Sequence, residues 1–99
     1  ILDVIVSDIL LETFPEASEG QLSKMRAAVV NEKTLAEIAK SLGIHQALRL
    51  GKGESQSGGH QKASILSSTL EAIIAAIYLD AGFNDTYPVV KKLFEPLFS

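Results

Sequence analysis

Glu71 is the residue whose surroundings in this sequence most strongly suggest chemistry. Six apolar residues, Ala72 to Ile77, follow it in a segment with helical periodicity. An ionised carboxylate in such surroundings is costly unless it is paired, hydrogen-bonded or bound to a metal ion. Ser68 lies three residues earlier, so the two side chains point the same way from a helix. Either Glu71 faces solvent in a polar stripe, or it binds a metal. The other members of that stripe are Ser64, Ser67 and Ser68.

A glycine-rich stretch is the second candidate for chemistry. Residues 51–59 hold four glycines among nine positions, which predicts a loop. No strand precedes it, and the Gly-x-x-x-x-Gly-Lys-Ser/Thr pattern of nucleotide-binding loops is absent. The basic and imidazole side chains in and beside the loop outnumber its single acid, Glu54. They are Arg49, Lys52, His60 and Lys62. The stretch is therefore a connector or a positive segment that lies against a phosphate backbone.

Other reactive groups are sparse. The sequence has no Cys, which excludes disulfides, thiolate metal sites and cysteine nucleophiles. Neither His45 nor His60 has a partner at metal-ligand spacing, so we expect surface or loop histidines. The serines lack the nucleophile-elbow motif that would indicate a Ser–His–Asp triad.

The composition describes one small, slightly acidic domain. The chain has 99 residues, of which 46% are hydrophobic and 21% charged, as is typical of a globular protein. Nine basic and twelve acidic residues give a net charge of −3, which argues against a generic basic nucleic-acid module. The longest apolar run is too short to span a bilayer, so we expect no membrane partner. Residues 1–11 lack the features of a signal peptide, and helical spacing already at Ile1 predicts a longer chain before it.

The elements that must position these groups are predicted to be helices. Apolar spacing indicates helices over residues 1–14, 18–30, 32–41, 44–50, 62–79 and about 84–98. Ser18 and Gln21 form a capping-box pattern at the second helix. Gly43 supplies a left-handed stop, and Asn84-Asp85 is expected to cap the last helix. No turn signal joins alternating runs, so strands are not expected. The predicted fold class is all-α.

Apolar residues at helical spacing are expected to point inward from each helix. In the third helix they are Leu35, Ile38, Ala39 and Leu42. In the long late helix they are Ile65, Leu66, Leu70, Ile73, Ile74 and Ile77.

Four blocks of sequence together resemble a known family. They are Ser18-Glu19-Gly20-x-Leu22-Ser23-x-x-Arg26-Ala27, Val30-Asn31-Glu32-x-Thr34-Leu35-Ala36, Leu50-Gly51-x-Gly53-Glu54-x-x-Ser57-Gly58-Gly59, and Ser64-Ile65-Leu66 with Glu71 to Gly82. Their order and spacing, over about residues 1–83, resemble the catalytic domain of bacterial ribonuclease III.

The resemblance implies what the protein does. It implies an all-helical endonuclease domain over residues 1–99, without the family's double-stranded-RNA-binding domain. Such a domain forms a homodimer and hydrolyses double-stranded RNA with Mg²⁺, for which Mn²⁺ can substitute. The resemblance also implies a cytoplasmic role in processing rRNA and other RNA.

The resemblance also assigns roles to the Glu71 segment. In the family, carboxylates from two segments hold the metal. One is the signature Glu-x-Leu-Glu-Phe-Leu-Gly-Asp, expected immediately before Ile1. The other is an Asp-x-x-Glu pair, which here reads Ser68-Thr69-Leu70-Glu71. Glu71 matches the catalytic metal-binding glutamate, whereas Ser68 stands in place of the usual aspartate. Because a hydroxyl is a weaker Mg²⁺ ligand, Ser68 binds through water, orients Glu71 or marks lost activity.

Further site residues are expected in two other blocks. Glu19 matches a residue type near the family's active site, although an acid there also suits a helix N-terminus. RNA contacts are expected from residues of the glycine-rich loop and its end, namely Lys52, Ser57, Gly58, His60 and Lys62.

Two rival functions remain beside the nuclease. One is a catalytically inactive relative that binds RNA or associates with the ribosome, which the Ser68 substitution favours. The other is a helical interaction domain without an RNA role, whose exposed apolar face would hold Leu2, Ile5 and Ile9.

Overall fold

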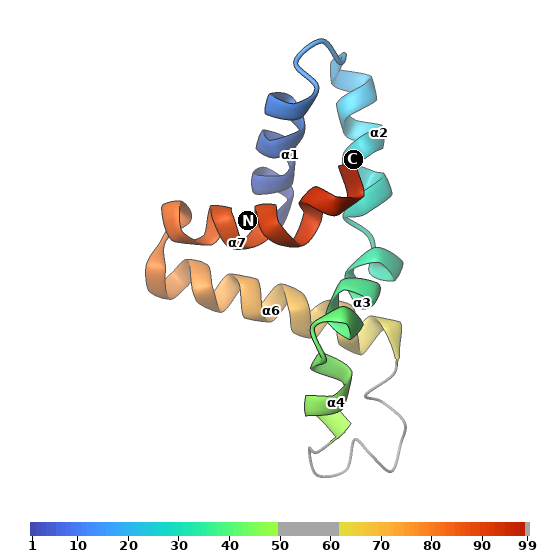
Figure 1. The fold of residues 1–99 in the computed structure, drawn as a ribbon, viewed down its shortest axis with the longest axis vertical. Coiled ribbons are helices and arrows are strands. Elements are labelled where there is room, and N and C mark those ends of the chain that lie inside the picture. Colours follow the sequence, from blue (N-terminus) through green and yellow to red (C-terminus); the bar gives the residue numbers. More distant parts are fainter. Residues whose placement is uncertain (50–61, 99) are drawn as a thin grey trace. The chain divides into compact units, whose positions relative to one another are not determined.

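The computed structural model describes residues 1–49 and 62–98, and every regular element in those ranges is a helix (Figure 1). The all-α prediction is confirmed for this part of the chain. Its contacts divide it into two units. The first holds residues 1–31 and 74–98, and the second holds residues 32–49 and 62–73.

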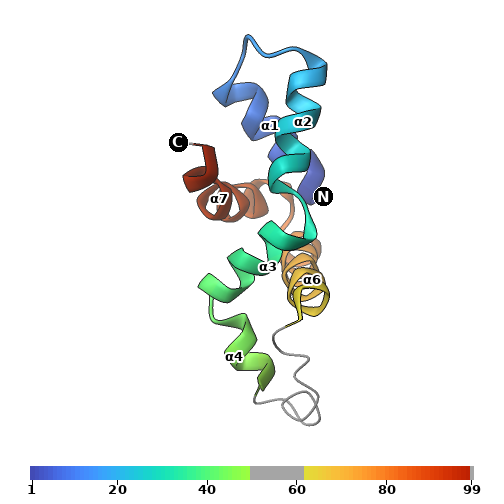
Figure 2. The same ribbon diagram turned by 90° about the vertical axis from the view of Figure 1, so that its right-hand side faces the viewer.

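The first unit is built on α1 (Leu2–Thr13), which packs against α2 (Glu19–Val29) and α7 (Phe83–Phe94). Figures 1 and 2 both show α1 and α2 side by side, joined by a short connection. A 3₁₀ helix, η2 (Glu95–Phe98), follows α7. The buried apolar residues of these helices recur every three or four positions, which is the spacing of one helix face. They are Leu2, Ile5, Val6, Ile9, Leu10, Val29, Val90 and Phe94.

Burial of the α1 face removes the basis for the interaction-domain hypothesis. That hypothesis needed Leu2, Ile5 and Ile9 on the surface, but all three side chains are buried. Full burial of an aliphatic side chain contributes about 1.5–3 kcal/mol, so these residues stabilise the fold of the unit. The expected exposed face is wrong because α7 and α2 both pack against α1.

The start of α2 is fixed by its predicted capping box. The Ser18 hydroxyl accepts a hydrogen bond from the Gln21 backbone N–H at 3.1 Å. The Gln21 side-chain oxygen accepts one from the Ser18 backbone N–H at 2.8 Å. The two bonds satisfy backbone donors that the first turn of a helix leaves without partners. Glu19 therefore becomes the first residue of α2.

The last helix differs from its prediction at both ends. α7 begins at Phe83 after Gly82, which has φ +84°, and no side chain caps it. The expected cap at Asn84-Asp85 is wrong because both residues already lie inside the helix. The Thr86 hydroxyl donates a hydrogen bond back to the Gly82 carbonyl at 2.8 Å, which caps none of the backbone N–H groups of the first turn. The α-helix ends at Phe94, and the chain continues to Phe98 in the 3₁₀ conformation.

The long late helix, α6 (Ala63–Ala81), is apolar on more than one face. Its buried apolar residues form a narrow stripe, Leu66, Leu70 and Ile74, spaced four residues apart. The prediction that Ile73 points inward is wrong, because it lies off this stripe and is exposed. Ile65 and Ile77 are half-buried, and Leu79 is 82% exposed.

The length and composition of α6 also bear on the membrane prediction. This helix has 19 residues and a mean hydropathy of 1.4, which suffices to cross a bilayer. The expectation that no segment is long and apolar enough is therefore wrong by these two criteria. A single helix of this kind is weak support for a membrane span, because core helices pass the same criteria.

The second unit contains α3 (Glu32–Ser41) and α4 (Ile44–Arg49), which pack against each other, together with the first half of α6. α3 has the predicted bounds, and Leu35, Ile38 and Ala39 are buried as expected. Leu42 is exposed, contrary to its prediction, because α3 has already ended at Ser41. Gly43 has φ +79° and supplies the predicted left-handed stop between the helices.

Candidate active site

Glu71 and Ser68 share the solvent-exposed side of α6. Both residues are exposed, and their spacing of three places them on neighbouring turns of one helix face. Glu71 therefore avoids the desolvation cost that an apolar environment would impose on its carboxylate. The exposed position agrees with the solvent-facing interpretation, and it also leaves the carboxylate open to a cation or substrate.

The polar stripe around this pair is only partly as predicted. Ser64 is exposed like Ser68 and Glu71, but Ser67 is 6% exposed and belongs to the buried side of α6. Ser67 directly follows the buried Leu66 and is buried beside it, although its spacing of four residues from Glu71 would also allow it on the exposed side. The Thr69 hydroxyl is engaged within the helix, because it donates a hydrogen bond to the Ile65 carbonyl at 2.7 Å.

A magnesium site needs several hard oxygen ligands around one point. Within residues 1–49 and 62–98, no group of three or more Asp, Glu or His side chains is arranged to hold a metal ion. Glu71 offers one carboxylate and Ser68 one neutral hydroxyl. The described residues of this chain therefore do not by themselves complete the metal site that the family resemblance implies.

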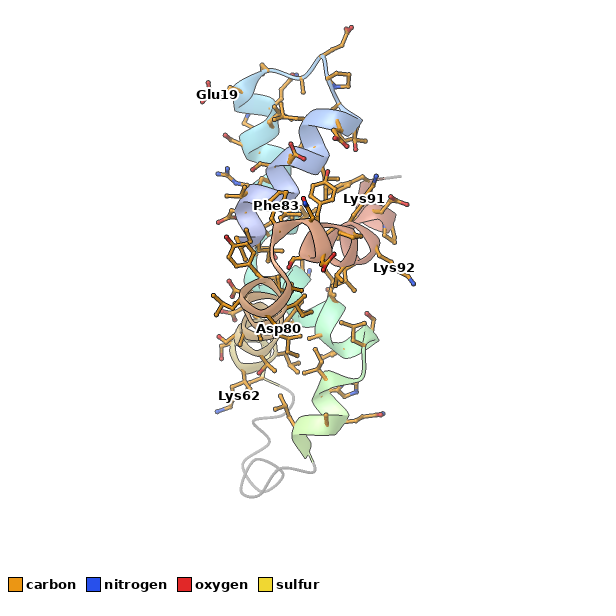
Figure 3. All side chains as sticks on the ribbon, turned by 90° about the vertical axis from the view of Figure 1, so that its left-hand side faces the viewer. Glu19, Lys62, Asp80, Phe83, Lys91 and Lys92 are labelled. Carbon is orange, nitrogen blue, oxygen red and sulfur yellow. The ribbon has the colours of Figure 1, made fainter. Side chains whose placement is uncertain are left out.

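Glu19 occupies the first turn of α2 in the first unit (Figure 3). Its carboxylate is exposed and complements the positive end of the helix dipole. The residue also lines a hollow of about 430 Å³ between α1 and α2, together with Ser23 and Arg26. Glu19 thus has a structural role at the helix end and a position in a concave surface.

The predicted RNA-binding residues are described only in part. Lys62 is exposed and immediately precedes α6, where Figure 3 labels it. Lys52, Ser57, Gly58 and His60 lie outside the described residues.

His45 reaches the surface only in part and lies in a helix, where the sequence predicted a surface or loop histidine. It lies in α4 and is half-buried. Its Nδ1 atom is buried without a hydrogen-bond partner in the part of the chain that the structure describes.

Tyr87 is a polar residue that sequence patterns did not indicate. Its hydroxyl lies 3.5 Å from Glu12 Oε2, so α7 donates a hydrogen bond to α1. Burial, followed by the neighbouring Asp8 and Glu12 carboxylates, raises the pKa of Tyr87 to about 12. The partners are 75 residues apart in sequence, so no local motif could have revealed the contact.

Comparison with known proteins places this fold and these residues in a family. The sequence model of a family described as ribonuclease-III-like matches residues 1–97, which is nearly the whole chain. The chain belongs to the ribonuclease-III-like family. The resemblance inferred from its four sequence blocks is thus confirmed.

Curated ribonuclease III proteins are similar to this chain at the sequence level. Ribonuclease 3 of Thermobifida fusca is 50% identical over 99 residues, which are 100% of this chain and 41% of that protein. Ribonuclease 3 of Streptomyces coelicolor is 50% identical over 97 residues, or 98% of this chain and 35% of that protein. The chain therefore spans less than half the length of these ribonuclease III relatives.

Solved structures confirm the ribonuclease III fold. The nuclease domain of ribonuclease III from Campylobacter jejuni superposes with a TM-score of 0.88 at 45% identity. The match covers 96% of this chain and 66% of the solved chain. That structure is described as flexible in a region involved in dimer formation of its nuclease domain. A second crystal structure of the same nuclease domain gives a TM-score of 0.86.

Proposed function

We propose that this chain is part of an endoribonuclease that hydrolyses the phosphodiester bonds of double-stranded RNA, in the processing of rRNA and other transcripts. The observation that carries the proposal is the exposed Glu71 carboxylate on a helix of a ribonuclease-III-like nuclease domain. In the reaction a water molecule adds to phosphorus, and the bond from phosphorus to one ribose oxygen breaks. Glu71 is positioned at the surface, where a bulky duplex can reach it.

A cation between Glu71 and its substrate would offset the repulsion between two negative groups. Both the carboxylate and the phosphodiester are negative, and the whole chain carries a net charge of −3. We therefore infer Mg²⁺, with Mn²⁺ as a substitute, as the cofactor of the longer protein. Glu71 would be one ligand, and the further carboxylates would come from outside the described residues.

This surface suits recognition of an RNA duplex by its shape better than recognition of a specific base sequence. The major groove of A-form RNA is deep and narrow, so proteins recognise the helix by its shape, 2′-hydroxyls and phosphates. The exposed Lys62 lies nine residues before Glu71 and would contact a phosphate. Such contacts carry no sequence information, which agrees with a nuclease that selects duplexes by shape.

We also propose that the protein acts as a homodimer. The description of the Campylobacter jejuni nuclease domain refers to a region involved in dimer formation, and the present chain has the same fold. Light scattering of the full-length protein at micromolar concentration should give the mass of two copies. A monomer under these conditions would contradict this part of the proposal.

Cleavage assays on matched variants test the nuclease proposal. The full-length protein with duplex RNA and Mg²⁺ should release short duplexes with 3′ overhangs. Glu71→Gln should lower the single-turnover rate at least 100-fold, because it removes one ligand charge while keeping the side-chain shape. Glu37→Gln removes another exposed carboxylate, from α3, and should leave the rate within twofold. If the wild-type protein cleaves no duplex RNA with any divalent ion, the proposed nuclease activity is excluded.

The Ser68 position favours a second candidate, a non-catalytic duplex-RNA-binding relative. Ser68 has no negative charge, so the exposed α6 side offers one carboxylate where the family pattern has two. If cleavage appears only after Ser68→Asp, the natural protein is a binder. If the wild-type protein cleaves and Glu71→Gln abolishes cleavage, this second candidate is excluded.

A further inference from the structure

The concave surface between α1 and α2 has a polar lining that the proposed chemistry of Glu71 does not use. This hollow has a volume of about 430 Å³, and we call it the α1–α2 hollow. Its lining residues are Ser7, Leu11, Ala17, Glu19, Leu22, Ser23 and Arg26. All of them belong to the first unit, so the shape of the hollow depends on that unit alone.

The polar groups of the α1–α2 hollow form one stripe along α2. Glu19, Ser23 and Arg26 are spaced four and three residues apart, which aligns them on a single helix face. Seven residues of α-helix rise about 10 Å, so a carboxylate and a guanidinium stand at opposite ends of the stripe with a hydroxyl between them. Ser7 of α1 adds a second hydroxyl.

The Arg26 guanidinium is held loosely enough to bind a ligand. Its Nη1 donates to the Ser7 hydroxyl at 3.5 Å, and its Nε lies 4.0 Å from Asp3 Oδ1. Both distances are long for charge-assisted contacts, which normally lie near 2.7–2.9 Å. The Arg26 side chain is 42% exposed. With five N–H donors in a planar fork, a guanidinium so placed can still bind a phosphate through two parallel hydrogen bonds.

Nearby acids limit which groups the hollow accepts. Asp3 and Asp8 line a neighbouring hollow of about 380 Å³, which shares Ser7, Leu11 and Arg26 with the α1–α2 hollow. The lining of the α1–α2 hollow itself includes one negative side chain, Glu19, and one positive side chain, Arg26. A ligand that is anionic at one end and a hydroxyl donor at the other end matches this arrangement.

We propose that the α1–α2 hollow is a ribose-phosphate subsite for one strand of duplex RNA. Arg26 binds a backbone phosphate, and Glu19 accepts a hydrogen bond from a 2′-hydroxyl. The Ser23 hydroxyl lies between them and offers a further hydrogen bond to the same ribose-phosphate unit. The subsite rests on the proposed function, which supplies the duplex, and it adds a reason for preferring RNA. DNA lacks the 2′-hydroxyl, so a DNA duplex would engage Arg26 but leave Glu19 without a donor.

Binding measurements on the full-length protein test the phosphate contact. Fluorescence anisotropy with a labelled RNA duplex, in Ca²⁺ to suppress cleavage, should show about tenfold weaker binding for Arg26→Gln. The slope of log affinity against log salt should also fall by about one. Lys24→Gln removes a positive charge from the exposed part of α2 outside the hollow. This matched control should change the affinity less than twofold.

Two further variants separate binding from folding. Asp3→Asn releases Arg26 from its acidic neighbour and should tighten duplex binding severalfold, which a merely structural role of Arg26 would not produce. Glu19→Ala removes the acceptor and should reduce the preference for RNA over DNA of the same sequence, with little change in DNA affinity. Thermal unfolding of each variant shows whether the fold is retained.

The subsite is overturned if Arg26→Gln and Lys24→Gln bind RNA equally well, or if Asp3→Asn weakens binding. Either result leaves the nuclease proposal intact, provided that the wild-type protein binds and cleaves the duplex. A wild-type protein that binds no duplex RNA would instead overturn the proposed function and the subsite together.

Discussion

The Tyr87 hydroxyl of α7 donates a hydrogen bond to the Glu12 carboxylate of α1 at 3.5 Å. Asp8, one turn earlier on α1, lies close enough to act on the same phenol. Two acids therefore face a group that would itself become negative at high pH. This arrangement explains why the pKa of Tyr87 rises to about 12, with burial as the largest cause and the two carboxylates adding to it.

The first prediction concerns alkaline stability. The unfolded chain loses the Tyr87 proton near the ordinary pKa of 10, whereas the folded chain keeps it until about pH 12. The folded state therefore binds more protons between these values, and the free energy of unfolding falls as the pH rises. Urea unfolding of the wild type should show this decline between pH 10 and 12, and Tyr87→Phe should reduce it. Equal declines in both proteins would contradict the assignment.

The second prediction compares two leucines of α6. Leu70 is 1% exposed and Leu79 is 82% exposed. Leu70→Ala should lower the free energy of unfolding by about 2–5 kcal/mol, because it leaves a cavity and loses buried apolar surface. Leu79→Ala should change it by less than about 0.5 kcal/mol. Chemical denaturation measures both, and a similar cost for the two variants would place the buried face of α6 elsewhere.

The third prediction compares two glycines. Gly82 has φ +84°, a left-handed conformation that strains any residue with a side chain. Gly82→Ala should therefore lower the free energy of unfolding by about 1 kcal/mol or more. Gly20 lies inside α2, where the nearest atom to an added Cβ, the Ser18 hydroxyl oxygen, is 4.0 Å away. Gly20→Ala should raise stability by about 0.5–1 kcal/mol, because alanine favours the helix. Thermal melts that reversed this order would contradict the backbone assignment.

The fourth prediction concerns the capping box of α2. Ser18→Ala removes the acceptor for the Gln21 backbone N–H and should cost about 1 kcal/mol of stability. Ser64→Ala removes an exposed hydroxyl from α6 and serves as the control. If both substitutions have the same small effect in urea unfolding, the cap contributes nothing measurable.

The fifth prediction concerns metal affinity at Glu71. Ser68→Asp places a second carboxylate one turn before Glu71 on the same side of α6, which should tighten Mn²⁺ binding by about tenfold or more. Ser64→Asp adds the same charge two turns before Glu71 and should have a smaller effect. Electron paramagnetic resonance of free Mn²⁺ reports the binding directly, without any assay of activity. Equal effects of the two variants would indicate general charge attraction rather than a ligand position.

Local sequence patterns predicted the helices well because their signals are local. The capping box of Ser18 and Gln21, the bounds of α3 and the stop at Gly43 each depend on neighbouring residues and are confirmed. The faces of α6 were harder to predict. Its sequence is apolar on several sides, so periodicity alone did not show that Ile73 is exposed and Ser67 buried.

The candidate site also has features that local sequence patterns predict and features that they do not. The exposed position of Glu71 and Ser68 on one side of a helix follows from their spacing, and the family followed from four ordered blocks of sequence. The Tyr87–Glu12 contact and the approach of Arg26 to Ser7 join residues 75 and 19 positions apart. Those contacts depend on how helices pack, which local patterns do not encode.

The capping box at Ser18 has a consequence beyond the stability of α2. Its two hydrogen bonds hold the first turn of α2, which carries Glu19, in the helical conformation. Without them this turn would fray, and Glu19 would lose its fixed position one turn before Ser23. Ser23 and Arg26 lie deeper in the helix and would keep their places in the hollow. Two hydrogen bonds at the end of a helix thus keep the carboxylate end of a surface hollow ordered.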